Sequence, residues 1–198
     1  MNESNYDRLG FLLLAECNNA ISLIQSSDEL KDIYAFCIDL DPDNGGFRIS
    51  WNTESAFNTT AELYKSKYNH THESLYQFFW GTKYNSGDFT FHLDNFQDSD
   101  VVLSELDSLF LAHSELCFQI CEADPLLDGH ERVLLVNEKL IDQAIWVINQ
   151  IDFKELDCTS SDFIAFVTLH DADDNTLLNL LKRTVSSSTV DNLPARIQ

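Results

Sequence analysis

Two short apolar runs, residues 33–40 and 163–169, place the strongest constraint on the fold of this chain. Both are rich in branched and aromatic residues, a composition typical of buried β-strands. The first run leads into Asp-Pro-Asp-Asn-Gly-Gly at 41–46 and then into another apolar run at 47–51. Because Pro and Asn-Gly favour tight turns, this segment predicts two strands joined by a hairpin turn.

Helices are predicted where apolar residues recur at intervals of three and four. The predicted helices cover about 5–25, 52–67, 98–120 and 131–151, with a shorter helix at 176–181. Asp98, Ser99 and Asp100 are expected to cap the third of these helices, which forms a helical hairpin with the fourth. A short strand is expected at 89–93, and residues 68–87 fit neither pattern.

Together these elements predict one α+β domain over residues 1–185. We expect a small, mainly antiparallel sheet covered by several helices. The sequence has no internal repeat and no linker that would divide the chain. Residues 186–198 are polar and contain several Ser, so we expect a flexible tail there.

The charge of the chain narrows the class of partner. Its 33 Asp and Glu outnumber the 12 Lys and Arg, which gives a net charge of −21 over 198 residues. No basic residue lies between Lys83 and Arg132, a stretch that contains many carboxylates. Such a surface repels phosphate groups and anionic lipids, so we expect no direct contact with nucleic acid or membranes. It attracts basic proteins and accelerates their association.

The sequence does not suggest a secreted or membrane protein. The apolar stretch at 11–15 follows acidic residues and leads into Glu16, unlike a signal peptide, and no run approaches the roughly 20 apolar residues that span a bilayer. The five cysteines form an odd set without a Cys-x-x-Cys pair, which is typical of reduced thiols. We therefore expect a cytoplasmic protein.

An acidic turn invites a calcium-binding interpretation. Asp39, Asp41 and Asp43 alternate as calcium ligands do. The glycine and the glutamate of a calcium-binding loop are missing from their positions, however, and strands replace the flanking helices. We expect an acidic hairpin turn without metal.

Two groups of histidines and cysteines have the spacing of metal ligands. His113, Cys117 and Cys121 are spaced by four on one predicted helix face, which suits zinc but is also typical of a packed apolar stripe. We expect core packing for these three. His70 and His72 offer two loop ligands, but no second cluster with ligand spacing completes their site.

Motifs of nucleophilic and phosphate chemistry are missing from the sequence. It contains no Gly-x-Ser-x-Gly and, with 6 glycines in total, no Gly-rich phosphate loop. We therefore expect a protein that is not an enzyme and has no cofactor.

Several segments resemble an acidic bacterial family of unknown function. They are the strand at 33–40 with its acidic turn, Ser-Trp-Asn-Thr-Glu at 50–54, Phe-Trp at 79–80 and the strand at 162–167. Members of that family resemble immunity proteins encoded beside polymorphic toxins. The resemblance implies a protein that blocks a secreted toxin's active site inside the producing cell.

Charge and resemblance together give the leading hypothesis: a non-enzymatic immunity protein that neutralises a basic partner, such as a nuclease toxin. Acidic side chains would occupy the surface that the toxin uses for phosphate, with Trp80 or Tyr84 as an exposed aromatic anchor. The expected contacts are Asp39, Asp41, Asp43, Trp80, Tyr84, Asp98, Asp100, Glu105, Asp107, Asp171, Asp173 and Asp174. Two alternatives stay open: a metal-dependent hydrolase that uses His70 and His72, and an adaptor whose acidity serves only solubility.

Overall fold

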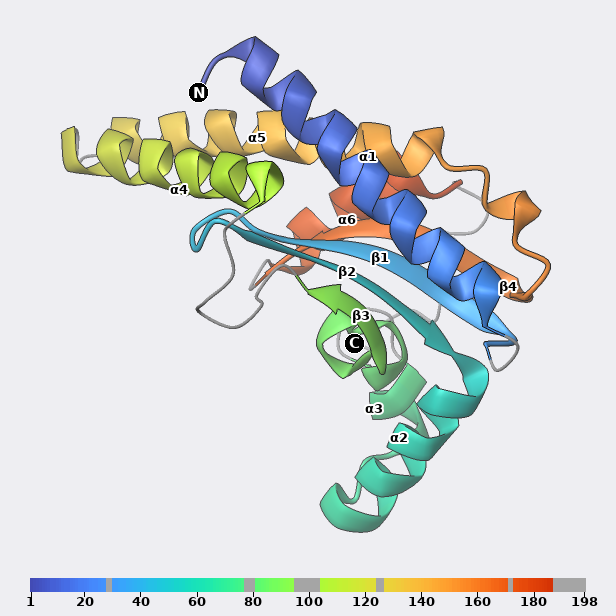
Figure 1. The fold of residues 1–198 in the computed structure, drawn as a ribbon. Helices are drawn as coiled ribbons and strands as arrows, with labels where there is room; N and C mark the ends of the chain where they lie inside the picture. The colour runs from blue at the N-terminus through green and yellow to red at the C-terminus, as the bar shows by residue number, and fades with distance from the viewer. Residues whose placement is uncertain (28–29, 77–80, 95–103, 124–126, 171–172, 187–198) are drawn as a thin grey trace.

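A computed structural model describes residues 1–27, 30–76, 81–94, 104–123, 127–170 and 173–186 (Figure 1). These residues form a four-stranded sheet of β1 (Ile33–Asp41), β2 (Gly46–Thr53), β3 (Phe91–Asp94) and β4 (Thr159–Leu169), in the order β3-β2-β1-β4. β1 pairs antiparallel with β2 and parallel with β4, and β2 pairs antiparallel with β3. The predicted α+β class, with a mainly antiparallel sheet, is therefore confirmed.

The hairpin of β1 and β2 follows the sequence prediction. Asp41 pairs with Gly46 at its end, and Asn44 donates its backbone N–H to Asp41 Oδ1 at 3.2 Å. Gly45 has a φ of +67°, and a Cβ atom added there would lie 3.0 Å from Leu111 Cα. Only glycine suits this position, because the left-handed backbone and the close approach of the neighbouring helix both disfavour a side chain.

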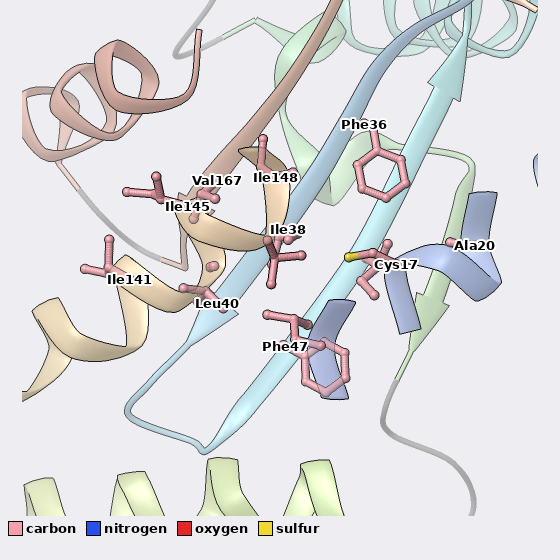
Figure 2. Close-up of a cluster of buried hydrophobic side chains, with 14 of the residues drawn as sticks. Cys17, Ala20, Phe36, Ile38, Leu40, Phe47, Ile141, Ile145, Ile148 and Val167 are labelled. Carbon is pink, nitrogen blue, oxygen red and sulfur yellow. The ribbon is translucent and has the colours of Figure 1, made fainter. Parts of the chain in front are cut away.

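Three long helices cover one face of the sheet: α1 (Glu3–Ser26), α4 (Glu105–Ala123) and α5 (Leu127–Gln150) (Figure 1). α1 begins with a capping box in which Asn2 and Asn5 exchange side-chain hydrogen bonds. Figure 2 shows how α1, the strands and α5 meet in this core, with Cys17, Phe36 and Ile145 among the buried side chains. The apolar stripes read from the sequence thus face the sheet.

Shorter elements cover the other face. They are α2 (Glu54–Tyr68), α3 (His72–Tyr76) and the 3-10 helices η1 (Thr82–Tyr84) and η2 (Ser86–Asp88). α6 (Asp174–Thr184) packs along the edge strand β4, which a third 3-10 helix, η3 (Phe153–Glu155), precedes. Cover on both faces explains why β1 is an almost continuous apolar run.

The start of α4 differs from the prediction. The helix begins at Glu105, and Ser104 caps it instead of the expected cap at 98–100. Asp107 donates its backbone N–H to Ser104 Oγ at 3.2 Å, and Ser104 donates its own N–H to Asp107 Oδ2 at 3.0 Å. These reciprocal bonds fix the first turn. Asp98, Ser99 and Asp100 lie outside the described residues.

Other boundaries differ by a few residues. β3 lies at 91–94 instead of 89–93, α5 starts at Leu127, and α6 covers more than the expected 176–181. The segment 68–87, which fitted neither pattern, contains α3 and the two 3-10 helices η1 and η2. Of the predicted tail at 186–198, all residues except Ser186 lie outside the described part of the chain.

Candidate partner-binding surface

The acidic hairpin turn and helix α4 lie side by side. Ser114 Oγ donates to the Asp43 carbonyl oxygen at 2.6 Å, and Gly45 approaches the backbone of Leu111. Glu115 follows Ser114 and is exposed. Two acidic segments that are distant in sequence therefore form one surface. We call the exposed carboxylates of Asp43 in the turn and of Glu115 and Glu122 on α4 the turn–α4 surface.

The turn is held in one conformation by its own side chains. Both carboxylate oxygens of Asp41 accept hydrogen bonds from the Asn44 side chain, at 3.0 and 2.9 Å. Asp43 is exposed, and its backbone carbonyl is bound by α4. Because the backbone is fixed at both points, the Asp43 carboxylate is presented to solvent from an ordered turn.

A neutral polar cluster lies between α1, α4 and α5. The Tyr6 hydroxyl lies 3.0 Å from His113 Nδ1, and His113 Nε2 lies 2.9 Å from Asn137 Oδ1. Cys117 Sγ donates to the same Asn137 oxygen at 3.4 Å. Burial lowers the pKa of His113, so the ring is neutral; its Nδ1 accepts a hydrogen bond from the Tyr6 hydroxyl and its Nε2–H donates to Asn137. We call these four residues the His113 cluster.

The three candidate zinc ligands of α4 do not converge. His113 and Cys117 are buried, as core packing predicts, whereas Cys121 is exposed. Burial raises the pKa of Cys117 to about 11, so its thiol stays protonated and is a poor ligand or nucleophile. In the described part of the chain, no three His, Cys, Asp or Glu side chains gather to hold a metal ion.

The two loop histidines pack against tyrosines. The His72 ring stacks on the Tyr76 ring at a centroid distance of 4.3 Å. The His70 ring lies edge-on to the Tyr64 ring at 5.2 Å. Both histidines therefore pack against tyrosine rings of α2 and α3.

Several predicted contact residues are already engaged in local structure. Glu105 accepts two hydrogen bonds from Arg8, at 2.9 and 2.7 Å, and these bonds lower the pKa of Glu105. Asp107 caps α4, as described above. Asp173 caps α6 by accepting the Thr176 N–H at 2.9 Å, which lowers the pKa of Asp173. These three carboxylates therefore have structural roles within the fold.

The expectation that Asp39 is an exposed residue of the turn is wrong. Asp39 lies in β1 and is largely buried. Strand alternation directs its side chain to the face of the sheet that α2, α3, η1 and η2 cover, which we call the second face. There Ser86 donates its hydroxyl to Asp39 Oδ2 at 2.8 Å. Burial raises the pKa of Asp39, while Ser86, His170 and Arg48 oppose that effect. Within the described residues, Asp39 Oδ1 has no hydrogen-bond partner.

The expectation that Tyr84 is an exposed anchor is wrong. Tyr84 is only 7% exposed and packs edge-on against Tyr34, with ring centroids 5.6 Å apart. η1 places the Tyr84 ring in the hydrophobic core on the second face of the sheet. Trp80, Asp98, Asp100 and Asp171 lie outside the described residues, and of Asp174 only the backbone, at the start of α6, is described.

A buried lysine binds two carboxylates on the second face. Lys83 Nζ lies 2.7 Å from Glu54 Oε1, 3.3 Å from Asp162 Oδ2 and 4.8 Å from the centre of the Tyr34 ring. Tyr34 donates its hydroxyl to the Lys83 carbonyl oxygen at 2.5 Å. Burial lowers the pKa of Lys83, but the hydrogen bond to Glu54 and the nearby negative charges outweigh it, so the pKa is raised. We call these four residues the Lys83 cluster.

Other basic side chains are also paired within the protein. The pairs are Arg8 with Glu105, Lys65 with Glu62, Lys139 with Glu3, and Arg183 with Glu138 and Asp142. None of these pairs involves a carboxylate of the turn–α4 surface. The negative potential there is therefore not cancelled by these cations.

Sequence reasoning missed the exposed apolar residues beside the acidic surface. Leu111 and Phe118 are 38% and 63% exposed on α4, and Leu134 and Leu135 are 52% and 68% exposed on α5. The signal was present, because on α4 these positions fall outside the buried stripe at 100° per residue. A helix prediction depends on the buried stripe alone.

Comparison with known proteins places the chain in a family. None of the helices in the described ranges is long and apolar enough to cross a membrane. No curated protein and no solved structure matches the chain. A family model matches residues 15–183, most of the sequence, and the chain therefore belongs to the family described as a domain of unknown function (DUF4303).

Proposed function

We propose that this chain binds and neutralises a basic protein, as an immunity protein blocks its cognate bacterial toxin, and that it is not an enzyme. The turn–α4 surface is the observation that carries the proposal. It presents carboxylates from two distant segments on a fixed backbone, in a chain with a net charge of −21. The polar cluster between α1, α4 and α5 is neutral, so it adds no compensating charge.

A toxin that acts on nucleic acid fits this surface best. Such a protein needs clustered Lys and Arg to hold phosphates. Carboxylates placed against those cations compete with the substrate and accelerate association by electrostatic attraction. We therefore favour a nuclease domain as the partner.

The proposal includes a cytoplasmic location, where a producing cell needs protection from its own toxin. All five cysteines are free, and three of them, Cys17, Cys37 and Cys117, are buried. Burial raises the pKa of Cys117 to about 11, and burial also raises the pKa of Cys17 and Cys37. Unpaired thiols are typical of a reducing compartment.

The test is binding between the purified chain and the product of the neighbouring gene, measured at low and high ionic strength. Glu115→Lys with Glu122→Lys changes the turn–α4 surface, and Glu155→Lys with Asp157→Lys is the control. All four side chains are exposed, and both variants make the same charge change. η3, which contains Glu155, lies beyond the other end of α5 (Figure 1).

We expect the association rate to fall at least about tenfold in the first variant and to change little in the control. Added salt should slow the wild-type association and should affect the first variant less. Equal binding by both variants, with no dependence on salt, would contradict the proposal. The acidic residues would then serve only the solubility of the protein.

A further inference from the structure

The α4–α5 hairpin extends away from the sheet. Figure 1 shows the end of α4 and the start of α5 continuing past the turn between β1 and β2. We call residues 115–123 of α4 and 131–137 of α5 the hairpin tip. The tip has a small core of its own, in which Cys117, Ile120 and Val133 are buried.

Large exposed apolar side chains lie next to the residues of that small core in the two helices. Phe118, Leu134 and Leu135 are 63%, 52% and 68% exposed. Because Cys117 bonds across to Asn137, the antiparallel helices place Phe118 and Leu134 at about the same level along the hairpin. Exposed apolar residues gathered at one end of a protein are typical of an interaction surface.

The charge of the tip indicates what kind of partner covers it. Glu115, Glu122 and Glu131 are exposed beside the apolar residues, and Arg132 is the exposed basic residue of the tip. A second copy of the chain would bring the same carboxylates and a further −21 charge against them. Like charges in an interface oppose association, whereas a basic partner complements this rim.

We propose that the hairpin tip is the docking surface for a basic amphipathic helix of the partner. Phe118, Leu134 and Leu135 would contact its apolar face, and the three carboxylates would contact its Lys or Arg residues. The inference rests on the proposed function. It adds where the partner docks and which apolar side chains contact it.

Two synthetic peptides test the docking surface. One is an amphipathic helix of Leu and Lys, and the other has the same composition in an order that forms no apolar face. Calorimetric titration should show that the wild-type chain binds the amphipathic peptide at least about tenfold more tightly, the ratio that one good apolar anchor supplies. Equal binding of the two peptides would overturn the inference.

Variants locate the binding. Phe118→Ser with Leu135→Ser should remove the preference for the amphipathic peptide, because both side chains lie in the tip. Leu23→Ser with Leu63→Ser is the matched control, since these exposed leucines lie on α1 and α2. Retention of the full preference by the first variant would overturn the inference.

Two further results separate this inference from the proposed function. If Glu115→Lys with Glu122→Lys weakens binding of the neighbouring gene's product and Phe118→Ser with Leu135→Ser does not, the proposed function stands and the docking surface is wrong. If neither variant weakens that binding, the proposed function and the docking surface are both wrong. Sedimentation that shows a dimer dissociated by Phe118→Ser would identify a second copy as the occupant and overturn the inference.

Discussion

Two buried polar clusters join the elements on the two faces of the sheet by different chemistry. The His113 cluster connects α1, α4 and α5 through neutral groups alone, with Tyr6 and Asn137 on either side of the imidazole. The Lys83 cluster connects β1, α2, η1 and β4 through one ammonium group between two carboxylates. One cluster depends on hydrogen-bond matching and the other on charge.

Access to water explains the difference. The side chains of Glu54 and Asp162 are 32% and 53% exposed, whereas His113 is fully buried. Carboxylates that reach solvent keep part of their hydration while they bind a buried ammonium group. The protein therefore buries a charge where its partners touch water and keeps the layer between its three long helices neutral.

Removal of the buried cation should have the largest effect. Lys83→Met leaves Glu54 and Asp162 without their shared cation but keeps the backbone carbonyl that Tyr34 binds. Breaking a fully buried ion pair costs about 3–5 kcal/mol, and the partial exposure of both carboxylates reduces the expected loss to about 2–3 kcal/mol. Urea denaturation measures this change in the free energy of unfolding.

An exposed ion pair supplies the control for that variant. Lys65 pairs with Glu62 on the surface of α2, where solvent screens both charges. Lys65→Met should leave the urea midpoint unchanged. A loss in Lys83→Met no greater than in Lys65→Met would mean that burial adds nothing to the Lys83 cluster.

Removal of the shared acceptor in the neutral cluster should have a smaller effect. Asn137→Ala removes the acceptor that His113 and Cys117 share and leaves His113 Nε2–H only the weak sulfur acceptor of Cys117 at 3.6 Å, at a cost of about 1–2 kcal/mol. Because no charge is involved, urea denaturation at low and high salt should give the same loss. A loss that shrinks as salt is added would show that charge enters the cluster after all.

The comparison also shows where sequence reasoning succeeds. The hairpin from β1 to β2 was predictable because its signals are local: a strand pattern, Pro and Asn-Gly. The parallel pairing of β4 with β1 was not, because register between distant segments depends on the helices packed between them. Likewise, charge predicted Asp43 at the surface, but Asp39 lies within β1 on the face that η2 covers, where Ser86 binds its carboxylate.

The chemistry of the candidate site was only partly predictable. Periodicity placed His113 and Cys117 on the buried face of α4. It did not reveal that Asn137 on another helix supplies their acceptor, because that contact joins two elements. Phe118 was not predicted because it lies outside the buried stripe of α4. An apolar residue there has no expected partner within its own chain.

The two clusters should weaken at opposite ends of the pH range. The pKa of folded His113 lies below the ordinary 6.5, so the unfolded chain takes up the proton first and stability is lost as pH falls below 6.5. The pKa of folded Lys83 lies above the ordinary 10.5, so its contribution is present below 10.5 and is lost as pH rises through the folded value. Each slope is at most about 1.4 kcal/mol per pH unit.

Two variants test whether His113 causes the loss of stability at acid pH and Lys83 the loss at alkaline pH. The free energy of unfolding, measured by urea denaturation across pH, should fall less on the acid side in His113→Gln and less on the alkaline side in Lys83→Met. Profiles of both variants that run parallel to the wild type at either end would contradict the assignment.

The smallest expected effect concerns a carboxylate that belongs to neither cluster. Burial raises the pKa of Asp39, and its Oδ1 has no hydrogen-bond partner in the described part of the chain. The folded chain therefore holds this proton longer than the unfolded chain, and stability falls as pH rises from 3.8 to the folded pKa. Asp39→Asn should remove that decline and stabilise the protein at pH 7 by less than either loss above, as urea denaturation would show. Destabilisation at pH 7 would instead mean that the charge of Asp39 is needed by its neighbours, and the second face would then contain a second charged cluster rather than an unsatisfied carboxylate.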